Sequence, residues 1–281
     1  MNENKLLKNS LYNVLYRGFT ALFPLVTTGY ISRVLLADGV GKVSYANTIV
    51  AYFTTVASLG IPNYGVKAIA QASGREKKTE TFIELFVINL VSTVLCTAAY
   101  YIFVNECTYF AEKKALFNVM GLMLILNVFN IDWLYQGVEE YGFIATRSIA
   151  IKIISFFLMV LIVKGPGDYV KYAFILCMAT AGNYIFNAIH VRRYIDIRQA
   201  QKLIFRKHLK PVFILLASSL ATEIYTMLDT VMLEYYHGDR FVGYYSNDVK
   251  IVRMIYTVVI ALVAAFYPRI SYYIKSGNTV E

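Results

Sequence analysis

Charged residues are scarce in this chain: they make up 16% of its 281 residues, whereas a soluble globular protein carries roughly a quarter. Apolar residues reach 58%, and the mean hydropathy is positive at +0.52. A chain with so few charges cannot cover the surface of a soluble globule. The shortage therefore argues against a soluble enzyme and favours an integral membrane protein.

Cysteine and histidine are also rare, with three of each. They stand far apart in the sequence, at Cys96, Cys107, Cys177, His190, His208 and His237. The sequence lacks Cys-x-x-Cys pairs and His-containing metal spacings. We therefore predict no metal site, no cofactor and no disulfide.

Long apolar runs are abundant. A helix needs about 20 mainly apolar residues to cross the roughly 30 Å hydrocarbon core of a bilayer. Eight such blocks can be drawn, over residues 10–36, 42–63, 82–104, 115–137, 142–163, 169–190, 211–235 and 241–268. The first follows Lys5 and Lys8, as in a signal peptide, but it is too long for one and is predicted to be a retained helix. The pattern predicts an all-α polytopic membrane bundle with about eight transmembrane helices.

The distribution of basic residues predicts an orientation. The net charge of +9 could suggest nucleic acid, but the Lys and Arg residues follow the loops. With a cytoplasmic N-terminus, sixteen of them fall on cytoplasmic segments and seven on the opposite side. We predict a bacterial cytoplasmic membrane protein with both termini cytoplasmic. The densest stretch, Arg192 to Lys210, is expected to contact anionic membrane lipids and not nucleic acid.

Two long connectors, Tyr64 to Thr81 and Val191 to Lys210, divide the chain. A similar sequence occurs on either side of the second connector: Val40-Gly41 is followed by Tyr45-Ala46-Asn47, and Val242-Gly243 is followed by Tyr245-Ser246-Asn247. This predicts a first lobe of six helices over 1–190, a basic connector over 191–210, and the first two helices of a second, pseudo-repeated lobe over 211–281. On this interpretation the second lobe is only begun within the sequence.

Several spans carry polar residues at helical spacing, which predicts faces turned away from lipid. The three stripes are Asn13, Arg17, Thr20, Pro24 and Thr27; Ser44, Thr48, Ala51, Thr55 and Ser58; and Ser219, Glu223, Thr226 and Thr230. One interpretation is a shared polar interior. The alternative is close helix packing, because Ser, Thr and small residues let membrane helices approach and form hydrogen bonds.

Charges inside the predicted spans are the main functional candidates, because a basic residue at the bilayer centre costs about 2.5–3.5 kcal/mol even on the milder scales. The basic candidates are Arg17, Lys152, Lys250 and Arg253, and the acidic ones are Glu223 and Asp229. They could form buried ion pairs, with the long basic stems reaching toward water. Alternatively, the four basic residues line a water-filled cavity whose positive potential attracts an anionic cargo, such as a lipid diphosphate.

Three stretches carry a family resemblance. They are GKVSYAN at 41–47 with its continuation to NYGVKAIA at 63–70, DWLYQGVE at 132–139, and LDTVML at 228–233 with VGYY at 242–245 and Pro268-Arg269. Together they resemble the Wzx-type polysaccharide flippases of the multidrug/oligosaccharidyl-lipid/polysaccharide exporter superfamily. Lys67 stands where relatives often carry Arg, and Leu134 departs from an aromatic position.

The resemblance implies transport without bond chemistry: a polyprenyl-diphosphate-linked oligosaccharide moves to the outer leaflet by alternating access between two lobes. Arg17 and Lys152 would meet the diphosphate first, and Lys250 or Arg253 after rocking. Glu223 or Asp229 would couple an ion, by analogy with drug exporters. Expected partners are the lipid-linked oligosaccharide, membrane lipids, and a polysaccharide polymerase or other assembly proteins. Two alternatives stay open, a cation-coupled multidrug exporter and a membrane enzyme of polysaccharide assembly.

Overall fold

The computed structural model describes the backbone of residues 3–196, 200 and 202–275, and the side chains of residue 23 and, within the same range, of residues 26–257. All regular structure in this range is helical. The elements are α1 (Glu3–Ser58), α2 (Ile61–Gln71), α3 (Gly74–Glu106), η1 (Thr108–Lys113), α4 (Lys114–Leu126), η2 (Asn127–Phe129), α5 (Asp132–Gly137), α6 (Tyr141–Ile162), η3 (Pro166–Asp168), α7 (Tyr169–His190), η4 (Val191–Arg193), α8 (Arg206–His237) and α9 (Asp239–Lys275).

Five segments within the described range are long and apolar enough to cross a membrane. They are Gly74–Glu106, Thr108–Gly137, Tyr141–Ile162, Pro166–Arg193 and Arg206–His237. Large apolar side chains on these helices point outward, for example Leu95, Phe157 and Ile185. The predicted fold class, an all-α polytopic membrane bundle, is confirmed.

The first two predicted spans form one element, α1, which bends at Leu36 (φ 58, ψ 179). The second half of α1 ends at Ser58, earlier than expected, because Leu59 and Gly60 adopt positive φ. The separate helix α2 then occupies residues that the sequence assigned to a connector. The fourth predicted span is also interrupted, since η2 and two further residues separate α4 from α5.

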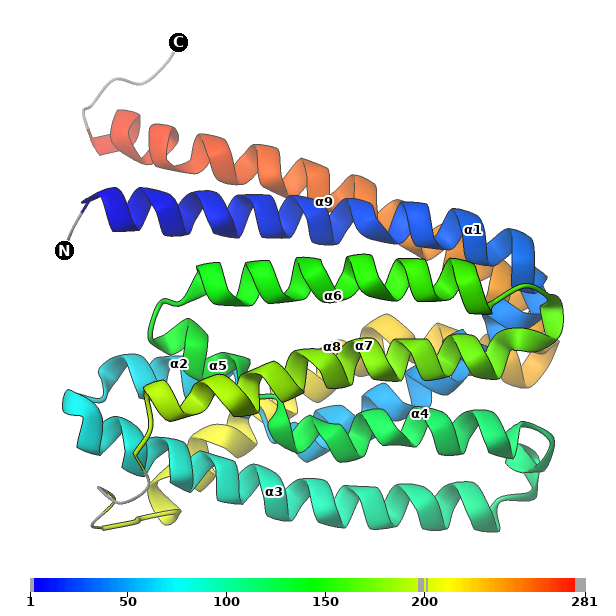
Figure 1. Cartoon of the computed structure of the whole chain (residues 1–281), viewed down its shortest axis with the longest axis horizontal. Coiled ribbons are helices and arrows are strands. Elements are labelled where there is room, and N and C mark those ends of the chain that lie inside the picture. Colours follow the sequence, from blue (N-terminus) through cyan, green and yellow to red (C-terminus); the bar gives the residue numbers. More distant parts are fainter. Residues whose placement is uncertain (1–2, 197–199, 201, 276–281) are drawn as a thin grey trace.

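The bundle has two ends, which lie at opposite sides of Figure 1. The hairpin end carries the bend of α1, η1, η3 and the junction of α8 with α9 at Gly238. The connector end carries α2, the start of α3, the α5–α6 junction, η4 and the start of α8. Exposed basic side chains gather at the connector end: Lys67, Arg75, Lys77, Arg192, Arg193, Lys202, Arg206, Lys207 and Lys210.

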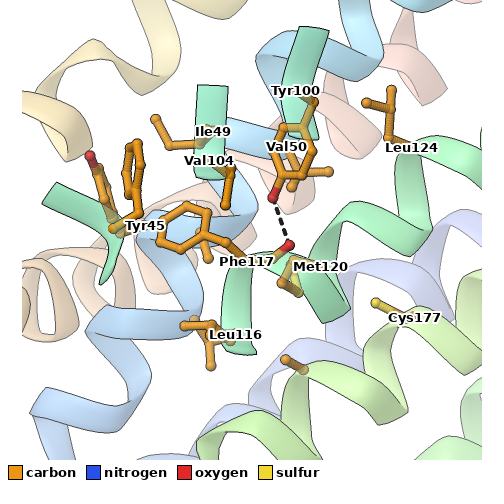
Figure 2. Close-up of a cluster of buried hydrophobic side chains, with 14 of the residues drawn as sticks. Tyr45, Ile49, Val50, Tyr100, Val104, Leu116, Phe117, Met120, Leu124 and Cys177 are labelled. Atoms are coloured by element: carbon orange, nitrogen blue, oxygen red, sulfur yellow. Dashed lines mark hydrogen bonds between the residues drawn. The ribbon is translucent and has the colours of Figure 1, made fainter. Parts of the chain in front are cut away.

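Helix α1 is the central element, with contacts to α3, α4, α6, α7, α8 and α9. Its Tyr45 ring meets Phe117 edge to face at 5.9 Å. Tyr100 of α3 is fully buried, and its hydroxyl donates to the Phe117 carbonyl at 2.7 Å (Figure 2). This packing fixes one face of the half-helix against α3 and α4, so that another face turns toward a polar cavity.

Candidate functional site

A cavity of about 570 Å³ lies between α1, α4, α5, α6, α7 and α9. Apolar residues such as Met123 and Leu176 form part of its wall. Its polar lining consists of Thr27, Ser44, Asn47, Asn130, Asp132, Ser148, Lys152, Ser155, Tyr172, Thr180, Asn183, Tyr184 and Lys250. A space of this size and polarity inside a membrane bundle can hold a polar group of substrate dimensions.

The two lysines reach the cavity from different parts of the chain. Lys152 stands eleven residues after the start of α6, about 16 Å from the connector end, and its Nζ lies 5.9 Å from the centre of the Phe23 ring. Lys250 stands eleven residues after the start of α9, about 16 Å from the hairpin end. Both ammonium-bearing side chains are half-buried. The structure therefore brings two of the predicted basic residues into one space at mid-depth.

Asp132 is the only acidic residue among the described residues that line the cavity, and its charge is already matched. Arg147 Nη2 donates to both carboxylate oxygens of Asp132, at 2.9 and 3.1 Å. The Arg147 side chain is 3% exposed, whereas the Asp132 side chain is 30% exposed where it lines the cavity, so the buried member of this ion pair is the guanidinium. The pair is neutral, and the two lysines leave the cavity with a positive charge.

Two asparagines of α7 complete the network around Arg147. Arg147 Nη1 donates to the Asn187 side-chain oxygen, and Nε donates to that of Asn183 at 3.1 Å. Asn187 Nδ2 donates to Asp132 at 2.8 Å, and Ser148 donates to Asn183 at 3.2 Å. Each charge is thus hydrogen-bonded on several sides, which is what a buried pair requires. The network joins α5, α6 and α7 into a rigid wall of the cavity.

The other predicted candidates lie elsewhere. Arg17 belongs to α1, but its side chain falls outside the described residues. Arg253 is exposed on α9 and does not line the cavity. Asp229 of α8 accepts a hydrogen bond from the Tyr245 hydroxyl of α9, and Glu223 is half-buried on α8. Helix α8 contributes none of the described lining residues, so its polar stripe does not share the interior of the cavity.

Sequence reasoning missed the Arg147 network. It counted Arg147 among the cytoplasmic charges and used Asp132 only as part of a motif. The available signal was spacing: Asp132 lies within one predicted span and Arg147 one turn inside the next, with a short connector between them. Two opposite charges so placed on antiparallel neighbours can pair.

No group of three or more His, Cys, Asp or Glu side chains in the described part of the chain is placed to hold a metal ion. The polar groups that line the cavity are the ammonium groups of two lysines, side-chain amides, hydroxyls and one paired carboxylate. These groups bind anions and hydroxyl-rich molecules by hydrogen bonds.

Residues 6–274 match the family model described as polysaccharide biosynthesis protein. The chain belongs to this family. Two curated relatives bear the name "Putative O-antigen transporter": one from Shigella dysenteriae, 23% identical over 272 residues, and one from Escherichia coli (strain K12), 23% identical over 279 residues. The matches cover 94% and 96% of this chain but only 67% and 66% of the relatives, so the chain spans about two thirds of their length. No solved structure matches it.

Proposed function

We propose that this protein is a flippase that moves a polyprenyl-diphosphate-linked oligosaccharide across the bacterial cytoplasmic membrane for surface polysaccharide synthesis. The observation that carries the proposal is the polar cavity with Lys152 and Lys250 at mid-depth, in a member of a polysaccharide biosynthesis family. The names of the two relatives support transport over bond chemistry.

The geometry suits such a cargo in three respects. Unpaired polar groups cost several kcal/mol in hydrocarbon, and the hydroxyl and amide lining offers them partners. The two ammonium groups supply charge-assisted hydrogen bonds to a diphosphate. The apolar outer faces of the helices leave a prenyl chain free to remain in the lipid. A cationic drug, by contrast, would meet two lysines and a carboxylate that is already paired.

The exposed basic residues of the connector end support a cytoplasmic position for this end, because positive loops are retained on that side. The hairpin end then faces outward. The cargo would enter near the connector end and leave past the hairpin end.

The test is to delete the gene in its native cell and locate the lipid-linked oligosaccharide with a membrane-impermeant sugar probe. We expect it to accumulate facing the cytoplasm, and re-expression of the chain to restore outward delivery. If the oligosaccharide lipid were never made, a role in synthesis would replace the flippase proposal. Normal delivery in the deletion strain would contradict the proposal outright.

A further inference from the structure

Two Gly-x-x-Ser segments that are far apart in the sequence meet at one helix crossing. They comprise Gly41 and Ser44 on the second half of α1, and Gly243 and Ser246 on α9. Ser44 Oγ donates to Ser246 Oγ at 3.1 Å, and the two serines are 202 residues apart, as are the two glycines. This offset of 202 residues is the one between Val40-Gly41 and Val242-Gly243 in the predicted repeat.

The glycine contacts are reciprocal. A Cβ atom on Gly41 would lie 1.7 Å from the carbonyl oxygen of Asp239, and one on Gly243 would lie 1.8 Å from that of Ala37. Ala37 and Asp239 are again 202 residues apart. Gly41 thus contacts Asp239, and Gly243 contacts Ala37, which is the equivalent of Asp239 on the other helix. Reciprocal contacts of this kind are the pattern of a two-fold axis. At this crossing the two backbones are in direct contact, and only glycine fits.

The crossing also closes the cavity. Val40, Val43 and Ser44 line the cavity at its hairpin end, next to Gly41. Val40 is 2% exposed and Val43 3%, so both side chains are buried beside the crossing. Separation of α9 from α1 at the glycines would open the hairpin end of the cavity.

An ion pair from a third element holds the crossing together. Lys113 of η1 donates to Glu234 of α8 at 2.8 Å and to Asp239 of α9 at 2.7 Å. Tyr109 of η1 also donates its hydroxyl to Glu234. The Glu234 and Asp239 side chains are 4% and 10% exposed, so both charges depend on Lys113. The two ion pairs of Lys113 are called the clamp below. Asp239 belongs to both the clamp and the crossing, because its carbonyl oxygen contacts Gly41.

The opposite end of α8 is fixed to the first lobe. His208 Nε2 lies 2.7 Å from Glu84 of α3, and its Nδ1 lies 2.9 Å from the Tyr64 hydroxyl of α2. Glu84 and His208 are 0% and 3% exposed. A movement that parts α8 and α9 from α1 at the hairpin end can therefore pivot about this cluster.

We propose that the Gly41–Gly243 crossing and its Lys113 clamp form the outer gate of the cavity, closed in this structure and opened in each transport cycle. This inference rests on the proposed function for its direction, outward release of cargo. Its structural content, a closed contact that must part, is testable without any cargo.

The first test uses the full chain with Cys96→Ala, Cys107→Ala and Cys177→Ala, into which Ser44→Cys and Ser246→Cys are introduced. Oxidation in native membranes should join fragments cut at the connector, and should lower outward delivery of the oligosaccharide lipid by about fivefold or more relative to the same variant when reduced. Each single-cysteine variant controls for oxidation itself. A disulfide that forms fully without slowing delivery would overturn the gate.

The second test measures accessibility and not transport. Asn47→Cys, in the cavity wall, is labelled from outside with a membrane-impermeant thiol reagent. Gly41→Val should raise the labelling rate about fivefold or more, because its side chain drives the helices apart. Gly29→Val is the matched control on the same helix, since nothing lies within 4 Å of its Cβ position.

The two proposals fail separately. Equal labelling in Gly41→Val and Gly29→Val would overturn the gate and leave the flippase proposal standing. A fivefold rise in labelling would support the gate. If deletion of the gene also left the oligosaccharide lipid correctly distributed, the gate would stand and the proposed cargo would be ruled out.

Discussion

Arg147 and Lys152 lie five residues apart on α6, but their surroundings differ. Arg147 is hydrogen-bonded to Asp132, Asn183 and Asn187. Lys152 lines the cavity beside the Phe23 ring, and Lys250 faces the same space from α9. At the residue scale, the first cation holds the wall together and the other two line the cavity.

Neutralising a cavity lysine should therefore reduce transport without loss of folding. A hydrogen bond to a charged group contributes about 1.5–3 kcal/mol, so Lys152→Gln or Lys250→Gln should each lower outward delivery about tenfold or more. Lys171→Gln is the control, because Lys171 is 60% exposed at the hairpin end. Delivery is measured with the impermeant sugar probe at equal membrane levels of each variant. Wild-type delivery by both cavity variants would contradict this role.

Removal of Arg147 should act on stability instead. Arg147→Met removes the buried guanidinium and leaves the Asp132, Asn183 and Asn187 side-chain oxygens without this donor, and an unsatisfied buried polar group costs about 1–3 kcal/mol. We expect a clear fall in the melting temperature of the detergent-solubilised protein. Arg147→Met with Asp132→Leu should recover part of the loss, since no lone charge remains. Lys171→Met, which breaks the exposed pair with Asp168, should change the melting temperature little.

At the element scale, α2 can pack closely against α5 because Gly65 has no side chain. A Cβ on Gly65 would lie 2.6 Å from the Trp133 ring, which is buried and stacked on Phe82 at 5.6 Å. Gly65→Ala should thus destabilise the protein by about 1–3 kcal/mol, the usual cost of overpacking. Thermal unfolding in detergent measures it, with Gly29→Ala as control. Equal melting temperatures would show that the ring can move away.

Several side chains of α3 hold the connector: Thr79 accepts a hydrogen bond from the Asp196 amide at 3.3 Å, and Glu80 accepts one from the Lys202 amide at 3.0 Å. Glu84 accepts hydrogen bonds from the Ile204 amide at 2.5 Å and from Lys207 at 2.8 Å, and it also contacts His208. Glu84→Ala should release this segment and increase tryptic cleavage at its exposed basic residues. Glu76→Ala, on an exposed position in the first turn of α3, is the control. Unchanged cleavage would mean that the connector is held by other contacts.

The sequence predicted most elements correctly because apolar length is a strong signal in membrane helices. The end of the first predicted span, at residue 36, coincides with the bend of α1 at Leu36. The sequence did not predict the break between α4 and α5. There Asn89 donates to the Val128 carbonyl at 3.5 Å, and Asn187 donates to the Phe129 carbonyl at 3.4 Å. Side chains distant in sequence thus replace the lost helical bonds, a compensation that no local pattern shows.

At the scale of the whole molecule, the sequence predicts a repeat but not that its two similar segments touch. In the structure Gly41 and Gly243 lie where α1 and α9 cross, and Ser44 donates to Ser246 at 3.1 Å. The candidate site shows the same limit: charge placement identified Lys152 and Lys250, but the cavity depends on how α1, α6, α7 and α9 meet. Which faces of these helices meet is a tertiary property.

The most direct measurement of the central claim, that this cavity carries the lipid-linked oligosaccharide, is site-specific photo-crosslinking in native membranes. A photoreactive residue replaces Leu176, which lines the cavity, or Phe157, which is 60% exposed on the outer surface of α6. We predict that the sugar-bearing lipid is captured at position 176 and not at 157. Equal capture at both positions, or none at 176 while the lipid is abundant, would contradict the account.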